Sequence, residues 1–163
     1  MTYERFEDLP VWKDSARLYE DVEALLEESA LHASRGFRDQ LDRATLSISN
    51  NIAEGFERGT TNELLAFLYI ARGSAGEVRS MLTIKLRSAR DAELKRRISN
   101  LVSLAESCSR QLRAWADHLQ NCEIKGQRHL TEKTRRLADQ KRRANEFQGK
   151  LTEIVRKSRK SQI

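Results

Sequence analysis

Residues 37–56 read FRDQLDRATLSISNNIAEGF. Apolar side chains recur in this segment at intervals of three and four residues, at Phe37, Leu41, Ala44, Ile48, Ile52 and Phe56. This interval is the period of one face of an α-helix, so the segment predicts an amphipathic helix that buries this face. We expect the helix to end between Gly55 and Gly59, because glycine readily adopts the positive φ that terminates helices.

The segment before it shows the same period. A first helix is expected from near Asp8, a suitable N-cap, with Pro10 in the first turn, where a missing N–H costs little. Its pattern breaks at residues 34–36. The apolar positions are Leu9, Trp12, Ala16, Tyr19, Val22, Leu25, Leu26 and Ala30.

Two more helices are expected downstream. Thr60 and Glu63 have the spacing of a capping box, which predicts the start of a third helix. The apolar positions of this helix are Leu64, Leu68, Ala71, Ala75, Val78 and Leu82, with Phe67 and Met81 widening the stripe. The fourth helix is expected from near Asp91, with Ser88 or Asp91 as its cap. Its apolar positions are Leu94, Ile98, Leu101, Val102, Ala105, Cys108, Leu112, Trp115, Ala116, Leu119 and Cys122.

The four helical patterns each run over about 20 residues and are joined by short connections, which make consecutive helices antiparallel neighbours. One proline and seven glycines in 163 residues leave few turns for a β-sandwich or barrel. The sequence therefore predicts an all-α fold, an up-down-up-down antiparallel four-helix bundle in residues 1–122. An additional basic C-terminal helix or tail is expected in residues 123–163.

Charge is unevenly distributed along the chain, whose net charge is +6. Residues 123–163 contain 13 Lys/Arg and 5 Asp/Glu, a net of +8, whereas residues 1–122 contain 17 and 19, a net of −2. A basic tail favours a polyanionic partner, with RNA first and DNA second; a merely solvating tail is the alternative. The candidate phosphate-binding residues are Lys133, Arg135, Arg136, Lys141, Arg142, Arg143, Lys150, Arg156, Lys157, Arg159 and Lys160.

The same tail has a weak heptad pattern. Leu130, Leu137, Ala144 and Leu151 follow one another at intervals of seven, but polar residues interrupt the second row. A fifth, basic helix is the resulting prediction.

Two glycines, Gly73 and Gly76, lie inside the predicted third helix, where each costs about 1 kcal/mol relative to alanine. Close approach of a neighbouring backbone would offset this cost. We therefore expect a tight helix crossing or a subunit contact at these two residues.

A polar cluster at the end of the second helix comprises Asn50, Asn51, Glu54 and Gly55. One interpretation is a hydrogen-bonded cluster that ends the helix and ties it to a neighbour. The other is a polar contact with a nucleic acid or another subunit.

No pattern in the sequence supports catalysis or cofactor binding. Phosphate-binding glycine loops and paired Glu-x-x-His segments are absent from the sequence, and His32, His118 and His129 are scattered. Cys108 and Cys122 are expected to be reduced packing residues. We predict a protein that is not an enzyme and has no metal or cofactor. Neither a run of about 20 apolar residues nor a secretory signal is present, so the expected location is the cytoplasm.

Three segments together resemble a known family. Ser47-Ile-Ser-Asn-Asn-Ile-Ala-Glu-Gly55-Phe resembles the hallmark of the four-helix-bundle family of 23S rRNA intervening-sequence proteins, and Phe6-Glu-Asp-Leu-Pro-Val-Trp12 resembles its opening. The third-helix pattern is similar at Glu63, Phe67, Leu68, Ala71, Gly73, Ser74 and Glu77. The similarity extends over about residues 4–120.

The resemblance implies a homopentameric barrel. A related branch, the accessory variability determinants of diversity-generating retroelements, implies binding of a reverse transcriptase and its template RNA. Two features depart from the pattern. Ser49 stands where the family usually has proline. The retroelement proteins are basic over the bundle, whereas residues 1–122 of this chain have a net charge of −2.

These observations predict a non-enzymatic, oligomeric RNA-binding accessory protein. If the chain resembles the retroelement branch in function, its protein partner is a reverse transcriptase. The alternatives are a protein encoded by an rRNA intervening sequence and a protein–protein scaffold without direct RNA binding.

Overall fold

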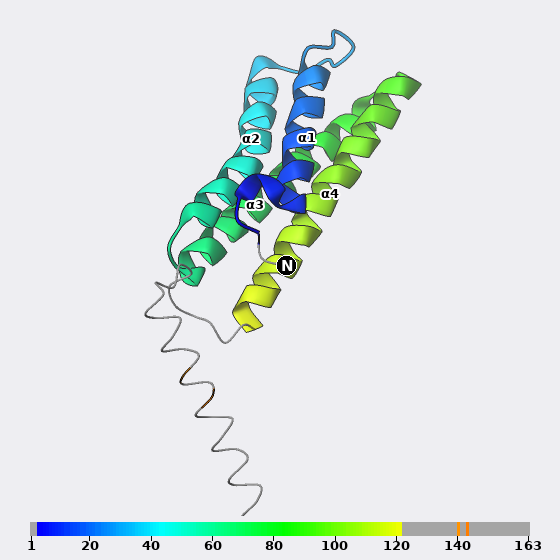
Figure 1. Ribbon diagram of the computed structural model, residues 1–163. Helices are drawn as coiled ribbons and strands as arrows, with labels where there is room; N and C mark the ends of the chain where they lie inside the picture. The colour runs from blue at the N-terminus through cyan, green and yellow to red at the C-terminus, as the bar shows by residue number, and fades with distance from the viewer. Residues whose placement is uncertain (1–2, 122–139, 141–142, 144–163) are drawn as a thin grey trace, which may run out of the picture. The chain divides into compact units, whose positions relative to one another are not determined.

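The computed structural model describes residues 3–121, 140 and 143. A short 3₁₀ helix, η1 (Phe6–Asp8), precedes four α-helices (Figure 1). They are α1 (Pro10–Leu26), α2 (Arg35–Glu57), α3 (Thr61–Ser88) and α4 (Ala92–Asn121). The described residues contain no strand, which confirms the all-α prediction. The boundary expected after Cys122 and most of the expected fifth helix lie outside the described residues.

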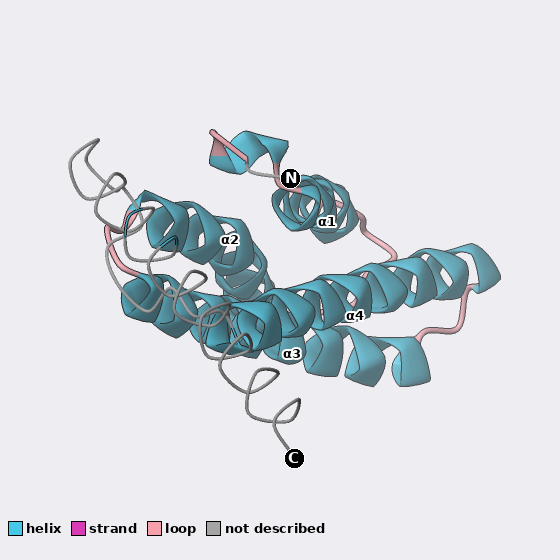
Figure 2. Ribbon diagram, turned by 60° about the horizontal axis from the view of Figure 1, so that its bottom comes forward, coloured by secondary structure: helices cyan, strands magenta, loops and turns pink. Residues whose placement is uncertain are grey.

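The four helices pack as a ring in which each contacts two neighbours. α2 and α4 both pack against α3 and against α1, and the contacts of α3 are the most extensive (Figure 2). Because consecutive helices are joined by short connections, they run antiparallel, as an up-down-up-down bundle requires. Within the described part of the chain, no helix combines the length and the apolar composition needed to cross a membrane.

The core confirms the predicted faces of three helices. α2 buries Leu41, Ala44, Ile48 and Ile52, and α3 buries all six positions expected from Leu64 to Leu82. The buried residues of α4 are Leu94, Ile98, Leu101, Ala105, Cys108, Leu112 and Ala116. Val102, Trp115 and Leu119 are half-buried at the edge of this core.

The predicted buried positions of the first helix are confirmed at Leu9, Val22 and Leu25 but are wrong in the first half of the helix. α1 buries Val11, Ser15, Leu18, Val22 and Leu25, whereas Trp12, Ala16 and Tyr19 are only half-buried. Ser15 is tolerated in the core because its hydroxyl donates to the backbone oxygen of Trp12, at 2.8 Å. The helix also ends at Leu26, earlier than its pattern indicated.

Side-chain caps define three of the helix starts. Ser34 accepts from the N–H of Phe37, Thr60 from that of Glu63, and Asp91 from that of Leu94. The caps expected at Thr60 and Asp91 are therefore confirmed, while α1 has Leu9 rather than Asp8 at its N-cap. Pro10 occupies the first helical position, as predicted.

The second helix ends at Glu57, between Gly55 and Gly59 as predicted, but the predicted mechanism is wrong. No glycine in the described residues has a positive φ, and Gly55 lies inside α2 with Arg58 as an extended C-cap. The helix ends by extension of the chain at Arg58, and Gly55 has a packing role instead.

Candidate nucleic-acid interface

Charge within the bundle is divided between its two helical hairpins. Residues 3–60, which include α1 and α2, contain 7 Lys/Arg and 13 Asp/Glu, a net of −6. Residues 61–121, which include α3 and α4, contain 10 and 6, a net of +4. The small net charge of the bundle thus conceals an acidic hairpin and a basic one.

Ion pairs neutralise part of this charge. Most join residues within one helix, such as Arg113 and Asp117 at 3.5 Å, and one joins Arg97 of α4 to Glu28. Five cations of the second hairpin have no hydrogen bond or ion pair from their side chains within residues 3–121: Arg72, Arg79, Arg87, Arg90 and Lys95. We call these five residues the cationic face.

The cationic face lies along the side of α3 that adjoins α4. Spacings of seven and eight residues bring Arg72, Arg79 and Arg87 to within about 80° of one another around the helix. Tyr69 lies on this side as well, and its hydroxyl accepts a hydrogen bond from Gln120 of α4. Arg72 is half-buried and the other four cations are exposed.

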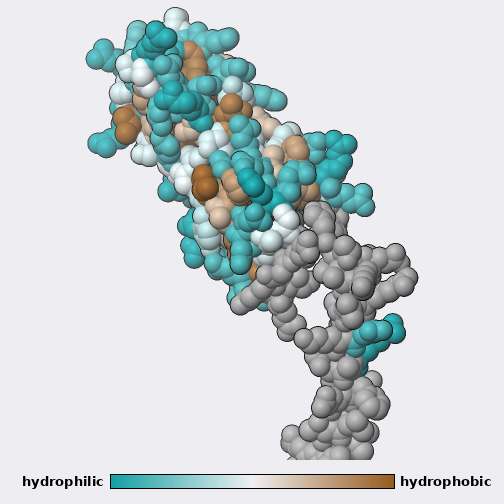
Figure 3. All heavy atoms as spheres, turned by 90° about the vertical axis from the view of Figure 1, so that its left-hand side faces the viewer, coloured by the Kyte–Doolittle hydropathy of each residue, from teal (hydrophilic) through white to brown (hydrophobic). Residues whose placement is uncertain are grey.

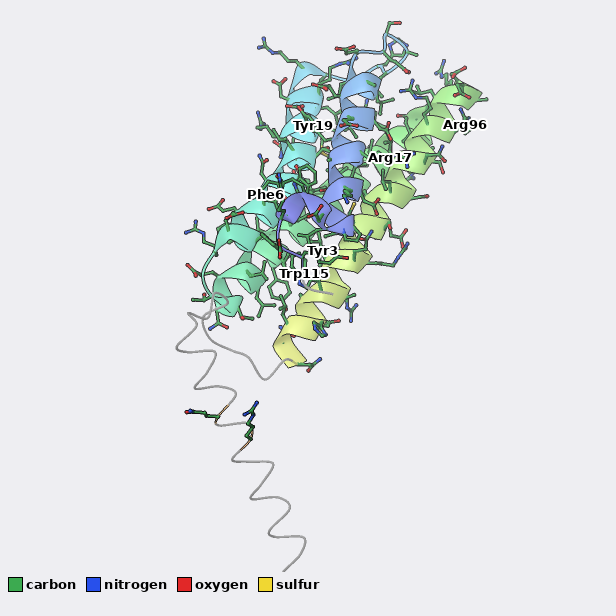
Figure 4. All side chains as sticks on the ribbon, viewed as in Figure 1. Tyr3, Phe6, Arg17, Tyr19, Arg96 and Trp115 are labelled. Atoms are coloured by element: carbon green, nitrogen blue, oxygen red, sulfur yellow. The ribbon has the colours of Figure 1, made fainter. Side chains whose placement is uncertain are left out.

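The cationic face continues across the connection between α3 and α4. Arg90 lies in that connection and Lys95 in the first turns of α4, the end of the helix where Figure 4 labels Arg96. Arg96 itself pairs with Glu93. Arg90 also borders a hollow of about 510 Å³ whose wall includes Lys85, although Lys85 already donates to the backbone oxygen of His32.

The first hairpin has the opposite character. Glu20, Glu23 and Glu27 of its exposed surface have no ion pair among the described residues. Tyr19 of α1, labelled in Figure 4, lies near Asp42 of α2. Burial, with the carboxylates of Asp42 and Glu23, raises the pKa of the Tyr19 hydroxyl.

The polar cluster predicted at the end of α2 divides into inner and outer residues. Asn51 donates to the backbone oxygen of Ser47 at 2.7 Å and to its hydroxyl at 2.9 Å. The Ser47 hydroxyl lies 3.0 Å from that of Ser74, which ties α2 to α3. Asn50 is exposed, and Glu54 pairs with Arg58 on the surface.

The fourth member of this cluster, Gly55, marks the closest approach of two helices. A Cβ atom added there would lie 2.7 Å from the Cβ of Phe67 and 3.2 Å from Cδ1 of Leu64. Two backbones therefore approach so closely at this point that only a residue without a side chain fits. The sequence pattern placed this kind of contact in α3 instead.

Gly73 and Gly76 are not at a helix crossing within the chain. Beyond its own helical turns, a Cβ added at either would have no described atom within 4 Å, so that part of the prediction is wrong. They lie on the outer side of α3, where Ile70 and Ile84 are 51% and 60% exposed. Figure 3 shows one face of the molecule, on which apolar side chains form separate spots among polar ones.

Chemically reactive groups do not converge within the described residues. No group of three or more His, Cys, Asp or Glu there could hold a metal ion. Cys108 is fully buried, and burial raises the pKa of its thiol to about 12, which keeps it protonated. Among the predicted phosphate-binding residues, only Arg143 is described; it has helical backbone and is exposed. The other ten, from Lys133 to Lys160, lie outside the described residues.

The five residues of the cationic face did not emerge as candidates from the sequence patterns. A count of charges for each helical hairpin would have located them approximately. Their lack of acidic partners could not have been counted, because it depends on which carboxylates lie within reach.

Fold and surface together define the class of protein: a small antiparallel four-helix bundle with an acidic and a basic hairpin. More particularly, the chain belongs to the family of 23S rRNA-intervening sequence proteins, whose family model matches residues 7–114. The resemblance inferred from three sequence segments is confirmed at this level.

A solved structure shares the fold. It is a protein of unknown function from the S23 ribosomal protein family of Bacteroides thetaiotaomicron, with 18% identity and a TM-score of 0.56. The similarity covers 65% of this chain and 97% of that one. No curated protein matches the chain.

Proposed function

We propose that this chain is a non-enzymatic, oligomeric accessory protein that binds RNA through the phosphate backbone. The observation that carries this proposal is the separation of charge along the chain. Acids exceed cations by 6 in residues 3–60, whereas cations exceed acids by 4 in residues 61–121 and by 8 in residues 123–163. Cations gathered on one region attract a polyanion, because neutralising phosphates releases the counterions condensed on the nucleic acid.

On the resemblance to retroelement accessory proteins, the proposed RNA is a template and the proposed protein partner is a reverse transcriptase. The complex would act in the cytoplasm. The acidic first hairpin supports a protein partner of this kind. Its exposed Glu20, Glu23 and Glu27, which have no ion pair among the described residues, offer a surface to a basic protein. A scaffold that recruits a basic protein without binding RNA is the second candidate function.

Binding of RNA by the full-length chain is expected to be tight at 50 mM salt and much weaker at 200 mM. Deletion of residues 123–163, which carry a net charge of +8, is expected to weaken binding at least tenfold at 100 mM salt and to reduce the salt dependence. Fluorescence anisotropy with a labelled RNA measures both. Failure of the full-length chain to bind RNA even at 50 mM salt would leave the scaffold as the better account.

Assembly into a homo-oligomer, with five subunits as the resemblance implies, is part of the proposal. Its support is the outer side of α3, where a Cβ added at Gly73 or Gly76 would meet no other helix among the described residues and apolar Ile70 and Ile84 are exposed. A neighbouring subunit that packs closely on this side would account for both glycines. Because glycine has no side chain, a helix of another subunit could approach the backbone of α3 closely at these positions.

Gly73→Leu is expected to reduce the oligomer toward the 18.8 kDa chain without unfolding it, because the added Cβ would meet no other described atom within 4 Å beyond the backbone of its own helical turns. Light scattering gives the mass, and thermal denaturation followed by circular dichroism gives the stability. Gly36→Leu is the matched control, since Gly36 has equally open surroundings on another helix. Equal masses for both variants and the parent chain would remove Gly73 from the interface.

A further inference from the structure

Three residues of the cationic face lie on one continuous helix, α3. Arg72 and Arg87 are 15 residues apart on α3, a distance of about 22 Å along the axis. That length corresponds to about six base steps of a B-form DNA duplex at roughly 3.4 Å per step, and to a somewhat larger number of steps in an A-form RNA duplex, whose rise is shorter. Lys95, beyond the connection, extends the row onto α4. The cations therefore form an extended track and not a single pocket.

Hydroxylated residues separate the cations of the cationic face. Ser80 and Thr83 lie between Arg72 and Arg87 on the same side of α3, and both are exposed. Absence of bulky side chains permits close approach of a phosphate backbone, and hydroxyl groups are common donors to phosphate oxygens. The exposed apolar residues Ile70 and Ile84 lie further round α3, on its outer side.

The cationic face has few groups that could recognise unpaired bases. Proteins that bind single strands stack successive bases on aromatic side chains. Tyr69 is the one aromatic residue of α3 and α4 among the large exposed hydrophobic residues in the described part of the chain, and its hydroxyl is engaged by Gln120. Double-stranded RNA, by contrast, is recognised mostly through its shape, its phosphates and its 2′-hydroxyls.

We propose that the cationic face is a binding site for the backbone of base-paired RNA, which lies lengthwise along the α3–α4 hairpin and is held independently of sequence. This inference rests on the proposed function and locates part of it within the bundle, separately from residues 123–163. Arg79, Arg87 and Lys95 are the central contacts, because they are exposed and lack acidic partners among the described residues.

The test uses the full chain with three neutralising substitutions, Arg79→Gln, Arg87→Gln and Lys95→Gln. The matched control has the same loss of charge on the acidic hairpin: Lys13→Gln, Arg35→Gln and Arg43→Gln, all exposed residues. Binding is measured by fluorescence anisotropy between 50 and 200 mM salt, with a hairpin RNA, an unstructured oligouridylate and polyglutamate as ligands. Circular dichroism confirms that both variants are folded.

For the hairpin RNA, the cationic-face variant is expected to bind about a hundredfold more weakly at 100 mM salt, with the logarithmic salt slope reduced by about 2 to 3, because each lost phosphate contact removes about 0.9. The control variant is expected to change binding less than about threefold, and oligouridylate is expected to bind the parent chain more weakly than the hairpin.

Equal loss in the two variants would overturn the inference, as would polyglutamate binding that depends on the same three cations as strongly as RNA binding does. If the parent chain binds the hairpin and the cationic-face variant binds it equally well, only this inference fails. If the parent chain binds no RNA at all, the proposed function fails with it.

Discussion

Gly55→Val is expected to destabilise the bundle by about 3 kcal/mol or more and to lower the melting temperature by about 10 °C. The added Cβ would lie 2.7 Å from the Cβ of Phe67. Because the backbone fixes the position of each Cβ, rotation of a side chain cannot relieve this clash. α2 and α3 would have to separate, which loosens Leu64 and its neighbours in the core. Gly55→Ala is expected to have the same sign, at about 1 to 2 kcal/mol. Urea denaturation followed by circular dichroism measures both.

Gly73→Ala provides the matched control for this substitution. It also replaces a helical glycine by alanine, but no atom lies within 4 Å of the added Cβ. Alanine in a helix interior gives a free energy of unfolding roughly 0.5–1 kcal/mol higher than glycine does, so this variant is expected to be slightly more stable than the parent chain. A Gly55→Ala variant that gained stability to the same extent would show that α2 and α3 do not meet closely at Gly55.

The contrast between these two glycines shows where the sequence is a sufficient guide and where it is not. Helical periodicity predicts α2, α3 and α4 with most of their buried faces, because apolar residues recur at most positions that face the core; the pattern misses the buried Thr45, Ser49 and Thr61. A glycine in such a pattern has no side chain to indicate a direction. Gly55 was therefore expected near a helix end and Gly73 at a crossing, whereas the close approach of α2 and α3 lies at Gly55 and Gly73 lies on the outer side of α3.

The first helix illustrates a second limit. Large Trp12 and Tyr19 suggest the buried face when apolar residues alone are counted, yet α1 buries Ser15 instead. A serine whose hydroxyl bonds to the preceding turn behaves as a small residue that needs no other partner. Because α1 has less extensive contacts with its neighbours than α3 has, its aromatic residues can lie at the edge of the core. Neither effect is visible in a hydrophobic pattern.

The candidate site depends on information of a third kind. Counting charges along the sequence finds the basic residues 123–163 and would also find the basic hairpin. It cannot show that Arg113 is neutralised by Asp117 while Arg79 has no acidic partner among the described residues. The difference between these two cations comes from helix spacing and packing, and it determines which cations are free to hold a phosphate.

Cys108 is expected to resist alkylation in the folded chain by a factor of about a thousand or more at pH 8. Burial, with a smaller contribution from Asp14, raises the pKa of the thiol from 9.0 to about 12, so its thiolate fraction at this pH falls by about a thousandfold. The side chain is also fully inaccessible to the reagent. A Cys122→Ser background leaves Cys108 as the only thiol, and iodoacetamide labelling with and without 8 M urea is followed by mass spectrometry. Rapid labelling without urea would contradict the buried placement of Cys108.

The same thiol makes the fold sensitive to alkali. The folded-state pKa of Cys108 lies above its unfolded value, so its contribution to stability is complete below about pH 9 and is lost as the pH rises toward 12. The loss is about 1.4 kcal/mol per pH unit in this window.

Replacement by alanine leaves a small cavity, so Cys108→Ala is expected to be less stable than the parent chain at pH 7. That difference is expected to shrink by about 2 kcal/mol between pH 9 and pH 10.5, because the variant has no thiol to ionise on unfolding. Urea denaturation of both chains across this range measures it, and a constant difference would mean that the buried thiol does not set the alkaline limit of the fold.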